Sequence, residues 1–124
     1  VIKQMSKDLA IPAEGIVKPT VREKDGLAMS SRNKYLSKEQ RSRALGISRS
    51  LREAERMIKS GETNAGVIKK NIKNILIDSG LRLDYIEGVE RSGFRPVETV
   101  KKGHTLIAIA CFCGKTRLID NMLV

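Results

Sequence analysis

The chain has 124 residues, of which 40% are hydrophobic and 31% charged, and its formal net charge is +10. This length suits one modest domain with a single hydrophobic core. No stretch is long and apolar enough to span a bilayer, and no basic start leads into an apolar secretion signal, so we expect a cytoplasmic protein without a membrane anchor.

The first part of the chain predicts one helix and one strand. Residues 1–9 are typical of the end of a helix, which Pro12 closes. Residues 15–21 favour a short strand, with Pro19 at an edge or near an end because proline cannot donate to a ladder. The chain begins at Val1 rather than at a methionine, and we therefore expect a fragment of a longer protein.

A loop over residues 21–33 combines a turn with a group of anion-binding donors. The Asp-Gly pair that ends at Gly26 predicts a tight turn, because glycine adopts positive φ without steric cost. Two hydroxyls and one guanidinium follow, from Ser30, Ser31 and Arg32. Asn33 opens a helical segment, so these donors lie near a helix start, where free N–H groups favour anions. By itself this pattern fits a polyphosphate-binding loop or a surface turn followed by a helix cap.

Two helices are predicted after this loop. A Ser-Lys-Glu-Gln capping pattern at Ser37 and a glycine stop at Gly61 bound the first helix. Thr63 or Asn64 caps the second helix, which ends at Gly80. Each helix carries an apolar stripe at helical spacing, and we expect both stripes to lie in the core. The stripes comprise Ala44, Leu45, Ile47, Leu51, Ala54, Met57 and Ile58, and Ile68, Ile72, Ile75 and Leu76.

The last third of the chain predicts strands. Leu81, Leu83 and Tyr85 alternate with polar residues, which indicates a half-buried strand with these three side chains on its dry face. Residues 105–112 form a nearly unbroken apolar run, typical of a central strand, and residues 115–119 return as its neighbour. Helices followed by antiparallel strands define the α+β class, here two helices packed on a small antiparallel sheet.

The two cysteines and the single histidine do not predict a metal site. Cys111 and Cys113 form a Cys-x-Cys pair with no second pair, and their apolar neighbours indicate two reduced thiols in the core. His104 has no acidic or cysteine partner at ligand spacing. We therefore interpret His104 as a turn residue and expect no metal ligands in this chain.

Two stretches of the sequence resemble the same family. The run from Arg22 to Leu36, R-E-K-D-G-L-A-M-S-S-R-N-K-Y-L, resembles the nucleotide-binding signature of the pantothenate synthetase (pantoate–beta-alanine ligase) family. The run from Gly114 to Asn121, G-K-T-R-L-I-D-N, is similar to that family's ending. The resemblance covers essentially the whole chain, but only the C-terminal part of the family's full length.

The resemblance implies a division of the chain into three parts. Residues 1–21 would be the tail of a preceding Rossmann-like nucleotide-binding domain, and residues 22–36 the ATP-phosphate-binding loop and inter-domain hinge. Residues 37–124 would form a C-terminal α+β lid domain. The family's His-x-Gly-His motif and its pantoate and beta-alanine sites would lie in the N-terminal domain that this chain lacks. ATP would be used with magnesium, whose ligands are not expected in this fragment.

The resemblance also implies an activity and residue roles. The full enzyme would condense pantoate with beta-alanine at the expense of ATP, through a pantoyl-adenylate and released pyrophosphate. Ser30 and Arg32 would be catalytic, and together with Ser31 they would bind the ATP phosphates. Met29 would line the same pocket, and Val21 would meet the adenine through its backbone. The full enzyme is expected to be a homodimer, and the fragment alone is expected to be inactive and to bind ATP weakly.

The basic charge leaves an alternative of another class, a nucleic-acid-binding or tRNA-synthetase-like appendage module. Two features argue against this alternative. Acidic residues interrupt the basic ones on the first long helix, as on a solvated face, and the four aromatic residues are too few for a base-stacking platform. A third possibility is that the isolated domain only dimerises or packs against another surface.

Overall fold

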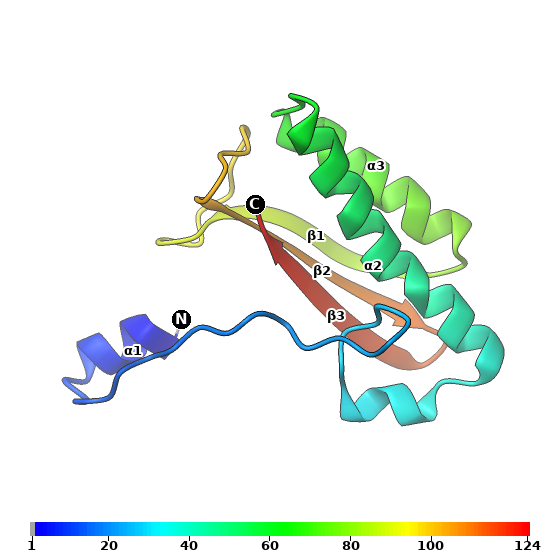
Figure 1. Ribbon diagram of the computed structural model, residues 1–124, viewed down its shortest axis with the longest axis horizontal. Coiled ribbons are helices and arrows are strands. Elements are labelled where there is room, and N and C mark those ends of the chain that lie inside the picture. The colour runs from blue at the N-terminus through cyan, green and yellow to red at the C-terminus, as the bar shows by residue number, and fades with distance from the viewer. Residues whose placement is uncertain (1) are drawn as a thin grey trace.

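Two helices cover one face of a three-stranded antiparallel sheet in the computed structural model, which describes residues 2–124 (Figure 1). The elements in chain order are α1 (Ile2–Asp8), the 3-10 helix η1 (Ser31–Tyr35), α2 (Lys38–Lys59), α3 (Ala65–Asp78), β1 (Arg82–Glu90), β2 (Thr105–Cys113) and β3 (Thr116–Leu123). The predicted α+β class, with two helices on a small antiparallel sheet, is confirmed. No helix within residues 2–124 combines the length and apolar character that a membrane crossing requires.

The two long helices begin at the predicted capping residues. The backbone N–H of Gln40 donates to the Ser37 hydroxyl at 3.2 Å, and the Ser37 N–H donates to the Gln40 side chain at 3.1 Å. This reciprocal capping box satisfies two N–H groups that the first turn leaves unpaired. For α3 the cap is Asn64, whose side chain accepts from the Val67 N–H at 3.1 Å, which decides between the two candidates.

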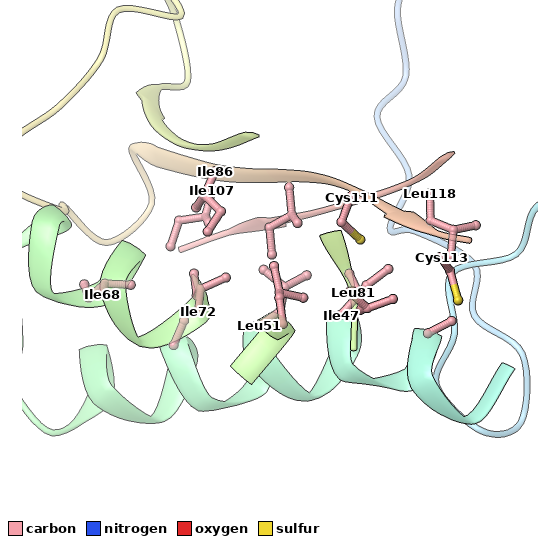
Figure 2. Packing of buried hydrophobic residues seen from close by; sticks show 14 of the residues in the cluster. Ile47, Leu51, Ile68, Ile72, Leu81, Ile86, Ile107, Cys111, Cys113 and Leu118 are labelled. Carbon is pink, nitrogen blue, oxygen red and sulfur yellow. The ribbon is translucent and has the colours of Figure 1, made fainter. Parts of the chain in front are cut away.

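The core lies between the helices and the sheet. Figure 2 shows side chains of α2, α3 and the strands pointing toward one another across this layer. Both predicted apolar stripes contribute to it, through Ala44, Ile47, Leu51, Ala54, Ile68, Ile72 and Leu76. Gly46 of α2 lies so close to Ser79, the C-cap of α3, that a Cβ at position 46 would overlap the Ser79 side chain. The amphipathic pattern of the sequence is therefore enough to orient both helices.

The central position of β2 is confirmed by the strand order β1-β2-β3. The predicted orientation of Tyr85 is wrong. A register shift between Leu83 and Tyr85 inserts one extra residue, so Ile86 takes the buried position and Tyr85 is exposed. A β-bulge of this kind moves every later side chain of a strand to the opposite face, and alternation along one strand does not reveal it.

The predicted strand over residues 15–21 is also wrong. These residues are exposed and have no regular structure, because within residues 2–124 no segment forms a ladder with them. Pro19 in addition lacks a donor for such a ladder. The predicted N-terminal helix is confirmed as α1, which buries no side chain, while Val1 lies outside the described residues.

Cys111 and Cys113 are free and buried, which confirms the prediction of two core thiols. Burial raises the pKa of Cys111 to about 12, so this thiol stays protonated at neutral pH. His104 lies in the turn before β2, as predicted. Among residues 2–124, no group of three or more His, Cys, Asp or Glu side chains is placed to hold a metal ion.

Candidate functional site

The predicted Asp-Gly turn forms the tip of a small hairpin. The Glu23 N–H donates to the Leu27 carbonyl at 2.8 Å, and the Met29 N–H donates to the Val21 carbonyl at 2.9 Å. Gly26 adopts a φ of +92°, the left-handed conformation that the sequence predicts there. The two hairpin bonds bring Val21 and Met29 side by side, although eight positions separate them in the sequence.

The predicted anion-binding donors follow the hairpin directly. Ser30 caps η1, and its hydroxyl accepts from the Arg32 N–H at 3.2 Å, which leaves the hydroxyl proton free to donate. Ser31 and Arg32 are exposed, and within residues 2–124 the Arg32 guanidinium makes no hydrogen bond or ion pair. Met29 is exposed as well. This stretch therefore presents one guanidinium, two hydroxyls and a thioether side chain to solvent.

Arg41 of α2 holds the hairpin from one side. Its Nη2 lies 2.5 Å from Glu23 Oε2, and its Nε donates to Asp25 Oδ2 at 2.9 Å. Asn33, which is buried, donates to Glu23 Oε1 at 2.5 Å and to the Ala28 carbonyl at 3.0 Å. The side chains of Glu23 and Asp25 are thus paired within the protein, whereas Arg32 has no partner among residues 2–124.

These contacts shift the ionisation of both carboxyl groups. The hydrogen bond from Asn33, followed by that from Arg41, lowers the pKa of Glu23 below its ordinary value of 4.5. The Leu27 N–H, followed by Arg41, lowers the pKa of Asp25 below 3.8. Both groups are therefore ionised at neutral pH, and the same contacts raise the pKa of Arg41.

We expect acid to loosen the attachment of the hairpin to α2. Because the folded-state pKa values of Glu23 and Asp25 are lowered, their stabilising contribution is complete above their ordinary values of 4.5 and 3.8. That contribution is lost as the pH falls through the lower folded-state values. In Arg41→Gln both pKa values should rise, which a carboxyl-carbon NMR titration measures. Arg43→Gln, which removes an exposed ion pair with Glu39 from the same helix, is the control and should leave both values in place. Unchanged midpoints in Arg41→Gln would contradict this prediction.

A second anchor, which we did not predict, joins the hairpin to β3. Arg22 donates to Asp120 through both Nη atoms, at 2.6 and 3.0 Å, and the Asp120 side chain is only 2% exposed. The sequence does carry a signal for this pair. Asp120 stands two residues after the buried Leu118 in a strand, so its side chain points into the protein, where a carboxylate requires a partner.

The five predicted site residues lie on the two ends of one hairpin and on the first turn of η1: Val21, Met29, Ser30, Ser31 and Arg32. The positioning contacts come from α2 and β3, so the long elements of the fold hold the loop in place. Two hydroxyls next to an arginine that has no partner among residues 2–124 are suited to bind a phosphorylated ligand.

A family model described as Pantoate-beta-alanine ligase matches residues 1–123. The chain belongs to the pantoate-beta-alanine ligase family.

Relatives and solved structures carry the corresponding protein name. The chain is 45% identical to a pantothenate synthetase of Thermosipho africanus over its whole length and 50% identical to one of Acetivibrio thermocellus, covering 44% of each relative. It thus spans less than half the length of these relatives and corresponds to their C-terminal part.

The fold is also found in crystal structures of a pantothenate synthetase and a pantoate-beta-alanine ligase. The structure of pantothenate synthetase from Thermus thermophilus matches with a TM-score of 0.89 and 34% identity, over 98% of this chain and 44% of that one. Pantoate-beta-alanine ligase from Francisella tularensis, complexed with beta-gamma ATP and beta-alanine, matches with a TM-score of 0.62 and 31% identity. That alignment covers 98% of this chain and 38% of the Francisella protein.

Proposed function

We propose that this chain is the C-terminal domain of an ATP-dependent ligase that condenses pantoate with beta-alanine to form pantothenate. The observation that carries the proposal is the stretch at residues 29–32, in which Arg32 stays unpaired within the described chain, directly after a hairpin that Arg41 and Asp120 anchor. Family membership and the ATP and beta-alanine named in the Francisella complex support the same substrates for the full enzyme.

The loop would act on the first step of the reaction. In that step the pantoate carboxylate attacks the α-phosphorus of ATP, the bond to the pyrophosphate breaks, and pantoyl-adenylate forms. Negative charge builds on the leaving pyrophosphate, and preorganised donors lower the barrier by stabilising that charge. Arg32 would bind the phosphates through its planar fork, with hydroxyl and backbone donors from Ser30 and Ser31. In the second step the beta-alanine amine attacks the activated carbonyl and AMP leaves.

The adenosine end of ATP would lie along the base of the hairpin. The Val21 carbonyl already accepts from Met29, whereas the Val21 N–H has no partner among residues 2–124 and can donate to an adenine ring nitrogen. The exposed Met29 side chain would line the same pocket.

Among residues 2–124, no group of three or more His, Cys, Asp or Glu side chains offers ligands for magnesium. The carboxylates nearest to the loop, Glu23 and Asp25, are engaged by Arg41 and Asn33. We therefore place the magnesium ligands, together with the pantoate and beta-alanine sites, in the N-terminal domain and assign no step here to the metal.

The three parts predicted from the sequence give this domain the role of a lid. Residues 1–21 would belong to the preceding Rossmann-like domain, residues 22–36 to the phosphate-binding loop and hinge region, and residues 37–124 to the lid. Because Arg22 and Arg41 fix part of residues 22–36 to the lid, we expect the hinge to extend into the exposed residues 15–21 that precede this region. We propose further that the full enzyme is a cytoplasmic homodimer, a location that the two free thiols support.

The test is pantoate-dependent exchange of labelled pyrophosphate into ATP. The full-length protein that contains this chain should catalyse the exchange. The 124-residue chain alone should catalyse neither the exchange nor pantoate-dependent AMP release, because we place the other substrate sites in the N-terminal domain. A full-length protein without exchange activity would contradict the proposal. Oligonucleotide affinity that falls steeply with salt would then favour the nucleic-acid-binding alternative.

A further inference from the structure

The two sequence stretches that resemble the ligase family meet in space, although 98 positions separate the residues that join them. Arg22, at the start of the hairpin, makes a bidentate pair with Asp120 of β3, at 2.6 and 3.0 Å. The Asp120 side chain is 2% exposed and that of Arg22 is 32% exposed. The Asp120 carboxylate is therefore almost fully removed from water, and its attraction to the Arg22 guanidinium is weakly screened.

Arg22 also contacts the tip and the returning half of the hairpin. The Nη1 of Arg22 also donates to the Gly26 carbonyl at the tip, at 3.2 Å, and the Arg22 backbone pairs with Ala28 on the returning strand. Asp120 is oriented in turn, because its Oδ1 also accepts from the Asn121 N–H at 2.8 Å. The Arg22 guanidinium thus links the tip of the hairpin to β3, and the Arg22 backbone pairs with Ala28, the residue directly before Met29.

Stability alone does not account for a buried carboxylate at this position. A buried ion pair gains little net stability over well-packed apolar side chains, because desolvation offsets the attraction between the charges. Its bidentate geometry does specify one orientation of the hairpin relative to β3. An apolar side chain at position 120 could fill the space without fixing that orientation.

We propose that Arg22 and Asp120 are positioning residues that hold the phosphate-binding loop in its ATP-competent arrangement from β3. This inference rests on the proposed function. Neither side chain is expected to touch ATP. When the pair is broken, the hairpin samples other arrangements. The apparent dissociation constant for ATP then equals the intrinsic constant divided by the fraction of molecules in the competent arrangement.

The experiment uses the full-length enzyme with Asp120→Asn, which keeps the size of the side chain and removes its charge. The matched control is Asp84→Asn, which breaks the exposed pair between Asp84 and Arg117, at 2.8 Å, away from the hairpin. We expect the KM for magnesium-ATP to rise about tenfold in Asp120→Asn, with the KM for pantoate unchanged. Asp84→Asn should leave both KM values unchanged. A loss of folded enzyme would lower the apparent kcat without changing either KM, so this readout separates positioning from stability.

Arg22→Lys provides a second test, because it retains the charge but loses the bidentate fork. It should raise the KM for magnesium-ATP in the same way even if Asp120→Asn fails to fold. Combined with Asp120→Asn it should add little further effect, since both changes break the same interaction. A KM for ATP in Asp120→Asn and in Arg22→Lys that equals the control value would overturn the inference.

Hydrogen exchange separates this inference from the proposed function. The amides of Gly26 and Met29 donate within the hairpin and should exchange about tenfold faster in Asp120→Asn than in Asp84→Asn, with α3 unaffected. If the wild type shows no pantoate-dependent activity, the proposed function is wrong, and this measurement alone decides the positioning role. Equal protection of the hairpin amides in the two variants would then overturn it.

Discussion

Replacing Arg32 by alanine in the full-length enzyme should lower pantoate-dependent exchange of pyrophosphate into ATP by about a hundred- to a thousandfold. Losing one preorganised donor to a developing charge typically costs about 3–4 kcal/mol of transition-state stabilisation. Arg32 is suited to this role because it is exposed and makes no ion pair within residues 2–124, while the hairpin before it is anchored on two sides. Initial rates of label incorporation, at saturating magnesium-ATP and pantoate, measure the effect.

Lys34→Ala is the matched control for this prediction. It removes one positive charge from the same 3-10 helix, where the Lys34 ammonium lies over the Tyr35 ring at 5.1 Å from its centroid. We expect its exchange rate to stay within about twofold of the wild type, because a single exposed charge is strongly screened. An Arg32→Ala enzyme that matched Lys34→Ala would leave the ligase assignment intact and reduce Arg32 to a surface residue.

The largest loss of stability should follow from Ile109→Ala. Ile109 lies in the central strand β2 and is 0% exposed, between the helices and the neighbouring strands. Removing a buried isoleucine side chain costs about 2–5 kcal/mol, through the lost transfer free energy and the cavity that remains. Urea unfolding of the 124-residue chain, followed by circular dichroism, gives the change in the free energy of unfolding.

Ile119→Ala on β3 removes the same atoms from a side chain that is 54% exposed. Its cost should stay below about 1 kcal/mol, because much of this side chain is in contact with water in the folded state as well. Equal losses in the two variants would show that the helices do not cover the sheet face on which Ile109 lies.

Local patterns in the sequence were sufficient for the elements of the domain. The Ser37 capping pattern and the Gly61 stop predict α2 closely, because helix ends depend on hydrogen bonds within a few residues of the cap. The apolar run of β2 predicts its central position, because a nearly continuous apolar sequence is typical of a strand that is buried on both faces. These features depend on neighbours in the sequence, which the sequence displays directly.

The pairing of one segment with another was harder to predict from the sequence. The predicted strand at residues 15–21 finds no partner within residues 2–124, and the bulge after Leu83 turns Tyr85 outward. A strand is defined by its ladder, so the partner and the register decide both outcomes. One strand read by itself does not contain that information.

The candidate site likewise has features that the local sequence predicts and features that depend on the tertiary structure. The sequence by itself determined the turn at Gly26 and the cluster of donors ending at Arg32, because each depends on residue type and local spacing. Only the tertiary structure decided which charges are already used. It pairs Glu23 and Asp25 with Arg41, and Arg22 with Asp120, across up to 98 positions, and leaves Arg32 unpaired within the described chain. Coulombic attraction and bidentate geometry act over a few ångströms of space, so the fold must bring these side chains together before a partner can be assigned.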